Sequence, residues 1–447
     1  MSTFAFLGML APPLMQTVNI GLIGGGTVGG GVYKALRRNG ALMASRLGVR
    51  LRVTRVAVSN VRKLRTVKFP RGILTRDWEG VVADPKIDLV AELVGGTGVA
   101  RQVALGALRS GKPVVTANKA LLAFHGEQLF RAARKHDANL YYEASVAGGI
   151  PIIKILREGL VGNRITRLYG ILNGTCNYIL SRMASEGVEF ADMVAEAQQM
   201  GYAEAEPSLD VDGHDAAHKA GILASLAHGF WVNPKSVYTE GIRSITPLDL
   251  EFARKLGYAI KLLGIVKGNG GAPVQVSVYP ALIPSGHVLA SVGGVYNGIL
   301  VRGDVVGDTL YYGQGAGQDA TASAVLSDLA DAALDLKHDT PDRRHAFVPH
   351  DTNGAVQSID NVSCSFYLRL SVVDRPGVLA QIASILARGR IGISSVIQPE
   401  GHQGTSVPLI LMIHDAPNAA MQKALAAIRR LKAVKGGPVL LRVEDFS

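Results

Sequence analysis

The stretch VNIGLIGGGTVGGGV (residues 18–32) joins a short apolar run to a glycine-rich turn and then to a helical pattern. Its glycines have the spacing GxGxxG, which is a useful signal of dinucleotide binding where it follows a strand and opens a helix. Glycine allows the tight turn and the close approach of a pyrophosphate, and the helix N-terminus presents N–H groups to that anion. The alternative is a glycine-rich turn without a ligand. The predicted contacts are Gly24, Gly26, Thr27, Val28 and Gly29.

Apolar runs and amphipathic stretches alternate through the rest of the first 147 residues. Such alternation is typical of a parallel sheet covered by helices. We therefore predict an α/β Rossmann domain over residues 1–147. Its further strands are expected at 51–58, 87–94, 112–118 and 138–145.

The end of the second predicted strand bears on which dinucleotide is bound. A carboxylate there would accept hydrogen bonds from a ribose hydroxyl, as in NAD sites, whereas basic residues accommodate the 2′-phosphate of NADP. The sequence has Ser59, Arg62 and Lys63 at this point and no acid. NADP is thus the predicted cofactor, with NAD as the alternative. These residues could equally be solvated loop charges.

The pattern changes over residues 148–345. Helical stretches precede two strand-like runs, which predicts an α+β domain with a mixed sheet. The helices are expected at 150–160, 175–185, 189–200, 213–230, 248–264 and 317–335, and the strands at 273–282 and 293–303.

The last part of the chain begins with a polar linker, residues 346–364. Residues 365–447 follow in the order strand, helix, strand, strand, helix, strand, which predicts a small ferredoxin-like domain. Its first helix has Pro376 in a first-turn position and an apolar stripe that includes Ile382 and Leu386.

Composition narrows the class of protein. A net charge of +11 invites nucleic-acid binding, but the basic residues are scattered, so we predict no nucleic acid among the partners. No apolar run is long enough to span a membrane. Two distant cysteines, Cys176 and Cys364, fit a reducing cytoplasm, and residues 1–15 are interpreted as an extension rather than a signal peptide.

The segment EAEPSLDVDGHDAAHKA (residues 204–220) contains five carboxylates, two histidines and one lysine. Asp212 and Asp215 have the spacing of a capping box at the start of a helix near Gly213. On that helix Asp215 and Lys219 share a face, as do His214 and His218. Three interpretations stay open: a surface ion pair, a metal site and an acid/base site.

An acid/base site needs the fewest coincidences. A buried lysine can exchange a proton with a substrate hydroxyl if burial or a neighbouring cation reduces its basicity. Lys119, in TANK (residues 116–119) at the end of a predicted strand, could be that cation or an ordinary residue at a helix start. Asp215 would then orient Lys219.

Seven segments in fixed order resemble the homoserine dehydrogenase family. They are GLIGGGTVGGGV (21–32), ELVGG (92–96), TANKALLA (116–123), YYEASVAGGIPII (141–153), GILNGTCNYIL (170–180), GYAEAEPSLDVDGHDAAHKA (201–220) and YYGQGAGQDATASAV (311–325). Residues 374–386, DRPGVLAQIASIL, resemble an ACT domain, an amino-acid-sensing module. Glu206 and Ala320 stand where the family usually has Asp and Pro.

This resemblance implies reversible reduction of L-aspartate 4-semialdehyde to L-homoserine with NAD(P)H, on the route to threonine, methionine and isoleucine. It implies Lys219 as the acid/base group, supported by Lys119 and Asp215, with Glu204 and Asp210 beside the substrate. Thr97, Lys119 and Gly317 would complete the cofactor site. A sodium ion would be held by groups at Glu143, Val146, Gly148 and Ile150.

The resemblance also implies threonine as an effector bound between paired tails near residues 374–379 and 393–395, a homodimer or homotetramer, and a tail whose removal leaves activity. Two alternatives use the same scaffold. One is a reductase of a related semialdehyde or hydroxy acid. The other is a sensor without turnover, against which the presence of both Lys119 and Lys219 argues.

Overall fold

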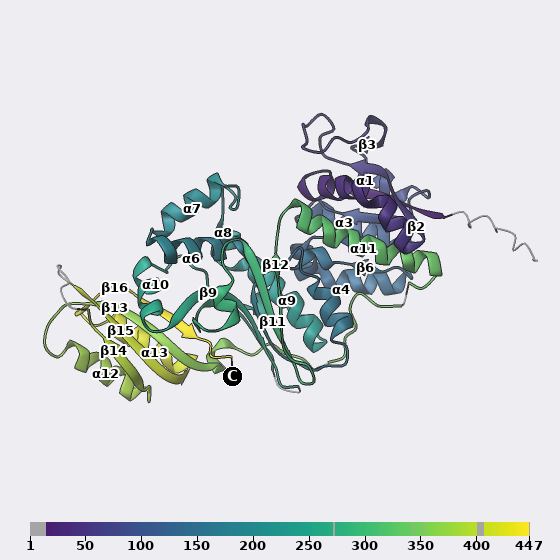
Figure 1. The fold of residues 1–447 in the computed structure, drawn as a ribbon. Coiled ribbons are helices and arrows are strands. Elements are labelled where there is room, and N and C mark those ends of the chain that lie inside the picture. The colour runs from purple at the N-terminus through teal and green to yellow at the C-terminus, as the bar shows by residue number, and fades with distance from the viewer. Residues whose placement is uncertain (1–14, 271–272, 342, 352, 400–405, 447) are drawn as a thin grey trace, which may run out of the picture. The chain divides into compact units, whose positions relative to one another are not determined.

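The computed structural model describes residues 15–270, 273–341, 343–351, 353–399 and 406–446, so the expected N-terminal extension lies outside the described residues except for Met15. The chain forms two compact units, and Figure 1 labels their elements. Unit 1 contains the residues up to Gly148 together with Gly317–Val348. Unit 2 contains Gly149–Ala316 and the chain from Pro349 onward.

Unit 1 is built on a parallel sheet with the strand order β3-β2-β1-β4-β5-β6. The strands are β1 (Gln16–Ile23), β2 (Val49–Ala57), β3 (Leu74–Thr75), β4 (Leu89–Glu92), β5 (Val114–Thr116) and β6 (Leu140–Tyr141). The predicted Rossmann-like α/β fold is confirmed. The strand predicted over 138–145 ends at Tyr141, and the 3₁₀ turn η2 (Glu143–Ser145) follows it.

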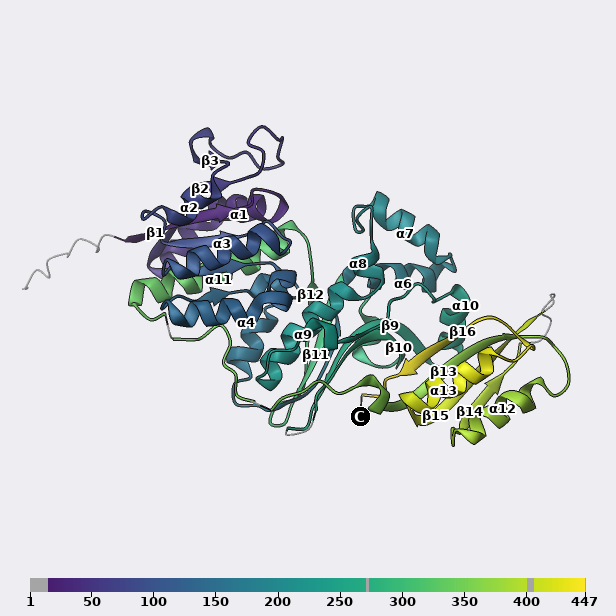
Figure 2. The same cartoon turned by 180° about the vertical axis from the view of Figure 1, so that it is seen from behind.

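Helices cover both faces of this sheet, as the opposite views of Figures 1 and 2 show. Helices α1 and α11 share one apolar cluster with the strands. The other helices of the unit pack against one another. The bounds are α1 (Thr27–Leu47), α2 (Trp78–Ala83), α3 (Gly98–Arg109), α4 (Lys119–Lys135), α11 (Gln318–His338) and the turn η1 (Arg71–Ile73).

Helix α11 packs with a different unit from the one expected. The sequence pattern places residues 317–335 in the second domain, yet α11 packs with unit 1. Its buried face, which includes Val325 and Leu329, completes the core under the sheet. Gly31 lets α11 approach α1, because a Cβ there would lie 3.2 Å from the Ala322 Cβ.

Unit 2 contains one long mixed sheet in the order β12-β11-β7-β9-β10-β16-β13-β15-β14, with β8 paired to β10. Among the strand pairs described in this second sheet, only β10–β16 and β8–β10 are parallel. The strands are β7 (Ile165–Ile171), β8 (Tyr238–Thr239), β9 (Tyr258–Lys267), β10 (Gln275–Pro284), β11 (Tyr296–Gly303), β12 (Gly307–Gln314), β13 (Ser363–Val372), β14 (Ile393–Ile397), β15 (Val407–Pro417) and β16 (Val434–Val443).

The helices of unit 2 include two, α6 and α9, that pack on the central strands. The helices are α5 (Ile152–Lys154), α6 (Gly174–Glu186), α7 (Phe190–Gln199), α8 (Ser208–Val211), α9 (His214–His228), α10 (Pro247–Lys255), α12 (Val378–Arg388) and α13 (Asn418–Arg429). The π-helical segment η3 (Ile155–Gly159) continues α5, and η4 (Pro234–Ser236), η5 (Val288–Ser291) and η6 (Ile359–Asn361) are short 3₁₀ turns.

The helix predicted over 248–264 is wrong in its second half. Helix α10 ends at Lys255, and Gly257, at φ +84°, turns the chain into β9. Residues 258–267 pair with β10, and residues 264–267 also pair with β7, so tertiary pairing overrides their helical spacing.

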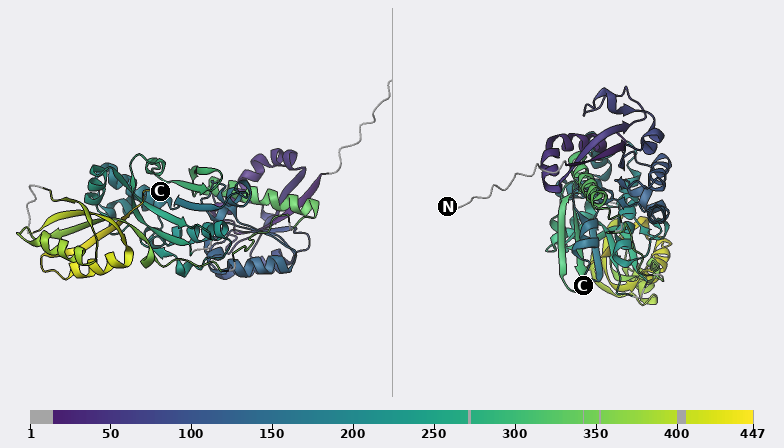
Figure 3. Two further views of the ribbon diagram at one scale, coloured as in Figure 1. Left: turned by 90° about the horizontal axis from the view of Figure 1, so that it is seen from below. Right: turned by 90° about the vertical axis from the view of Figure 1, so that its right-hand side faces the viewer.

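The tail has the predicted order of strands and helices. Its strands lie in the order β16-β13-β15-β14, and α12 and α13 pack together on one face of them (Figure 3). However, β16 also pairs with β10, so the sheet continues from the tail into the rest of unit 2.

Candidate active site

The glycine turn after β1 has three glycines with different surroundings. Gly24 adopts φ +111°, and a Cβ there would lie 2.5 Å from the Leu93 carbonyl oxygen. A Cβ on Gly29 would lie 2.0 Å from the carbonyl oxygen of Gly24. Around Gly26 no heavy atom lies within 4 Å of the Cβ position. Gly24 and Gly29 therefore allow the backbone to pack tightly. Gly26 leaves the backbone at the start of α1 accessible to a ligand, and the N–H groups there favour an anion.

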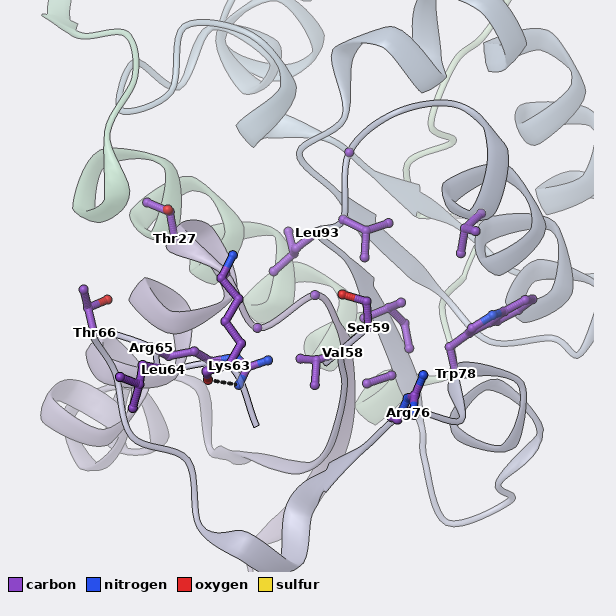
Figure 4. Close-up of a pocket in the computed structure, with 18 residues that line it drawn as sticks. Thr27, Val58, Ser59, Lys63, Leu64, Arg65, Thr66, Arg76, Trp78 and Leu93 are labelled. Atoms are coloured by element: carbon purple, nitrogen blue, oxygen red, sulfur yellow. Dashed lines mark hydrogen bonds between the residues drawn. The ribbon is translucent and has the colours of Figure 1, made fainter. Parts of the chain in front are cut away.

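A cavity of about 780 Å³ opens beside this turn (Figure 4). Its walls come from the turn, the segment after β2, the start of α2 and the segment after β4. Its volume is in the range of small-molecule sites. The lining residues are Ile23, Gly24, Gly25, Gly26, Thr27, Ala57, Val58, Ser59, Lys63, Leu64, Arg65, Thr66, Arg76, Trp78, Leu93, Val94, Gly95 and Val99.

All the charged residues that line this cavity are basic. Lys63, Arg65 and Arg76 contribute to the wall, and Figure 4 shows Lys63 beside Arg65, with Arg76 apart from them toward Trp78. The Arg65 guanidinium donates to the Lys63 carbonyl at 2.8 Å, which shapes the loop. Arg62, a predicted contact, does not line the cavity, and sequence reasoning missed Arg65 and Arg76.

The loop at Gly317 lies next to the glycine turn. The Gln318 side chain donates to the Thr27 carbonyl at 3.1 Å. Thr97 is the N-cap residue of α3, just beyond the cavity wall formed by Val94 and Gly95. Both positions are thus near the turn in the fold, although neither lines the cavity itself.

A buried network at the ends of β4 and β5 was not predicted. Glu92 accepts from the Val94 N–H at 2.9 Å and from the Thr116 hydroxyl at 2.7 Å. Burial raises the pKa of the Glu92 carboxyl. Asn118 caps α4 by accepting from the Leu121 N–H, and its amide donates to the Gly96 carbonyl at 2.6 Å. These bonds hold the cavity wall and place Lys119 as the first residue of α4.

In unit 2 the charged segment divides into a buried and an exposed part. Lys219 and Asp215 are buried on α9, 8% and 3% exposed. The Lys219 Nζ lies 2.8 Å from the Asp215 Oδ2 and donates to the Leu172 carbonyl at 2.8 Å. A solvated surface ion pair is therefore the wrong interpretation of this spacing.

Asn173 joins this pair to Asp210. Its amide nitrogen donates to the Asp210 carboxylate at 2.7 Å and to the Asp215 Oδ2 at 2.9 Å. Its carbonyl oxygen accepts from the Cys176 N–H and so caps α6. Burial raises the pKa of the Cys176 thiol, which stays neutral beside these carboxylates. The sequence gives no sign of this role for Asn173, because it does not show which strand ends meet.

The more exposed part of the segment contacts Arg243 through Asp212. Asp212 accepts from its guanidinium, and this hydrogen bond lowers the pKa of the Asp212 carboxyl. The predicted capping box is wrong: the N-cap of α9 is Gly213, at φ +85°, without a side-chain cap. His214 is exposed.

The metal and substrate predictions have different outcomes. Within the described residues no group of three or more His, Cys, Asp or Glu side chains could hold a metal ion, so the structure does not support a site at His214 and His218. Glu204 is exposed, and only Asp210 of the two predicted substrate acids joins the buried cluster.

The predicted sodium residues follow β6. Glu143 and Val146 are buried, and the Glu143 N–H donates to the Asp328 carboxylate at 2.8 Å. Gly148, at φ +46°, ends this part of unit 1, and Ile150 belongs to unit 2. Lys119 and Lys219 likewise belong to different units, so their pairing stays a prediction.

Comparison with known proteins agrees with these observations. Residues 24–143 match the family model for the homoserine dehydrogenase NAD-binding domain, and residues 151–330 match that for homoserine dehydrogenase. The chain is 42% identical over 435 residues to a homoserine dehydrogenase of Neisseria gonorrhoeae, covering 97% of this chain and 100% of the relative. The corresponding values for one of Pseudomonas aeruginosa are 44% over 438 residues, with 97% and 100% covered.

Solved structures show the same likeness. A homoserine dehydrogenase from Thiobacillus denitrificans matches with a TM-score of 0.90 at 43% identity, covering 97% of this chain and 99% of that chain. A hyperthermophilic archaeal homoserine dehydrogenase in complex with NADPH matches with a TM-score of 0.60 at 27% identity, covering 71% and 98%. With relatives this similar over nearly its whole length, the chain belongs to the homoserine dehydrogenase family.

Proposed function

We propose that this NAD(P)-dependent oxidoreductase interconverts L-aspartate 4-semialdehyde and L-homoserine, with Lys219 as the acid/base group. The observation that carries the proposal is the buried Lys219–Asp215 pair, fixed at 2.8 Å and joined through Asn173 to Asp210. A lysine that is held this firmly is oriented rather than solvated.

The proton step follows from how Lys219 is held. An ammonium group has three donors. Leu172 and Asp215 accept two of them, and we assign the third to the substrate oxygen. A bound nicotinamide supplies or removes the hydride at the adjacent carbon. As charge grows on the carbonyl oxygen, Lys219 gives it a proton, and in the oxidation of homoserine Lys219 takes that proton back.

Substrate positioning is assigned to the acids and to Lys119. A substrate ammonium group needs carboxylate acceptors, and Asp210, beside Asn173, is suited to this role. Glu204 is proposed as a second acceptor by resemblance alone. Lys119 would add positive potential near the reacting oxygen, and its place is set by the Asn118 cap.

For the cofactor we propose NADP over NAD. Support comes from the cavity wall, where Ser59, Lys63, Arg65 and Arg76 offer donors and positive charge to a 2′-phosphate. The archaeal relative that is described in complex with NADPH is consistent with this. Contacts at Gly24, Gly26, Thr27, Val28, Gly29, Thr97 and Gly317 remain part of the proposal, whereas Arg62 lies outside the lining.

Regulation and assembly are proposed on the family resemblance. We propose that an ACT-like tail senses threonine and that the protein forms a homodimer or homotetramer. We further propose that a sodium ion binds at Glu143, Val146, Gly148 and Ile150. A cytoplasmic location is likewise a prediction. In the described residues no helix is both long and apolar enough to cross a membrane.

The test is homoserine-dependent reduction of NADP+ by the purified protein. We expect Lys219→Ala to lower kcat by at least about 100-fold with little change in cofactor affinity, because proton transfer by a positioned group contributes about that factor. Full turnover by the variant would remove Lys219 from the mechanism. Cofactor binding, measured by fluorescence titration of NADPH, is the control for folding.

A further inference from the structure

The last strand of the chain contains a buried cation that pairs with a residue near α9. Arg442, on β16, is fully buried. Its guanidinium donates to the Glu240 Oε2 at 2.7 Å and to the Asn418 side-chain oxygen at 2.8 Å. It also lies over the Tyr238 and Tyr279 rings, with 4.6 Å between the guanidinium carbon and the Tyr279 centroid. Both terminal nitrogens of the guanidinium are thus hydrogen-bonded, whereas its buried Nε has no hydrogen-bond partner among the described residues. Such a buried cation depends on its partners.

Glu240 belongs to a segment that is fixed on both sides. Its N–H donates to the Val278 carbonyl of β10 at 2.7 Å. The Ile242 N–H donates to the Val211 carbonyl at 2.8 Å. Between them, a Cβ on Gly241 would lie 2.2 Å from the Val211 carbonyl oxygen, so the two backbones are in direct contact.

This contact reaches the start of the active-site helix. Gly213, the N-cap of α9, has its Cβ position 3.1 Å from the Glu240 carbonyl oxygen. Asp215 lies two residues beyond Gly213, and Lys219 lies one helical turn further along α9. Figure 2 shows β16 beside β10 in the same sheet, and the two strands pair at Ala281 and Arg442.

We propose that Arg442 and Glu240 are positioning residues for Lys219. The ion pair holds the segment 238–243 against residues 211–213, which sets where α9 begins and therefore where the Lys219 ammonium lies. The tail would thus contribute to the geometry of the catalytic site in every molecule, with or without an effector. This inference rests on the proposed role of Lys219.

The test compares two arginines of the full-length protein. Arg442→Met removes the cation beside Glu240. Arg369→Met is the matched control, since Arg369 also joins a tail strand to the rest of unit 2, through Asp249 at 2.9 Å. The two pairs are buried on opposite sides: the Asp249 side chain is 0% exposed and that of Arg369 is 15% exposed, whereas the Glu240 side chain is 33% exposed and that of Arg442 is 1% exposed.

We expect Arg442→Met to lower kcat for homoserine oxidation at least about tenfold, while KM for the cofactor changes less than about twofold. Arg369→Met should keep kcat within about twofold, although its melting temperature also falls, because it too removes an ion pair with a buried carboxylate. Arg442→Lys should keep part of the kcat that Arg442→Met loses, because lysine retains the positive charge but cannot bond Glu240 and Asn418 in the guanidinium geometry. Glu240→Gln, at a partly exposed position, should show the same loss of kcat if Arg442→Met does not fold.

Two results would overturn the inference. One is unchanged kcat in Arg442→Met, or in Glu240→Gln if Arg442→Met does not fold. The other is an equal loss of kcat in Arg369→Met, which would make the effect general destabilisation. Lys219→Ala in the same assay separates the two proposals. If it retains turnover, the proposed acid/base role fails; if it loses turnover while both pair variants keep theirs, only the present inference fails.

Discussion

Lys63 and Arg76 lie on the wall of the dinucleotide cavity, from different segments of the chain. Charge-assisted hydrogen bonds to a phosphate contribute about 1.5–3 kcal/mol each. We therefore expect the double variant Lys63→Gln/Arg76→Gln to raise KM for NADP at least about tenfold and to leave KM for NAD nearly unchanged, as measured by initial rates. Arg62→Gln is the control, because Arg62 is exposed and outside the lining. An equal change for both cofactors would contradict NADP selectivity at this wall.

Lys261 is a buried lysine that the proposed mechanism does not use. On β9 its Nζ donates to the Val292 carbonyl at 2.6 Å and to the Asn177 side-chain oxygen at 3.2 Å. Burial lowers the pKa of Lys261 to about 8. Between pH 8 and about 10.4, its value in an unfolded chain, the unfolded state binds more protons than the folded state. The free energy of unfolding should therefore rise with pH in this window.

This titration can be measured against Lys261→Met. We expect the free energy of unfolding of the wild type, relative to that of the variant, to rise by about 2 kcal/mol from pH 7 to pH 9.5. Denaturant unfolding at several pH values gives the difference directly. A constant difference across that range would show that Lys261 titrates normally in the folded protein.

At the scale of the element, β16 is the strand that joins the tail to the rest of unit 2. Beyond it, Phe446 packs edge-on against Tyr169 and stacks on His287, and belongs to the core cluster of the central strands. Deleting residues 360–447 would expose this core and one edge of β10. The expectation that such a deletion leaves activity therefore conflicts with the packing.

The contribution of this contact can be measured with one substitution. Phe446→Ala should lower the free energy of unfolding by about 3–5 kcal/mol, as large-to-small core substitutions do. Leu379→Ala, at an exposed position on α12, should change it by less than about 0.5 kcal/mol. Denaturant titrations of both variants test the difference, and equal effects would mean that the end of the chain is not part of the core.

The elements also show where spacing misleads. Residues 258–267 follow α10 with apolar side chains at helical intervals, but they form β9 between β7 and β10. Conversely, α6 and α9 begin within one residue of the predicted starts; the Asn173 side chain caps α6, whereas α9 begins after Gly213 without the predicted side-chain cap. The helical spacing thus failed where a residue's neighbours in a sheet decided its conformation.

At the scale of the whole molecule, the tail raises the question of control. Asp374 precedes α12 and accepts from the Gln398 side chain at 3.3 Å, next to the expected effector residues. We expect threonine to inhibit homoserine oxidation by the full-length protein, and Asp374→Asn to raise the concentration for half inhibition about tenfold. Initial rates at several homoserine concentrations test this. Purely competitive inhibition that Asp374→Asn does not alter would place threonine in the active site instead.

Features that depend on near neighbours in the chain could be predicted from the residues alone. The glycine spacing at Gly24, Gly26 and Gly29 predicted the first strand, turn and helix. The four-residue spacing of Asp215 and Lys219 predicted their pairing, because residues one helical turn apart share a face.

Features that depend on partners far along the chain became clear from the packing of the folded protein. In the folded protein Asn173 lies between Asp210 and Asp215, α11 packs with unit 1, and Arg442 lies beside Glu240. The physical reason is that burial and strand pairing depend on which segments pack together. A carboxylate, a lysine or an apolar run has the same local pattern whether it ends in solvent or in a core.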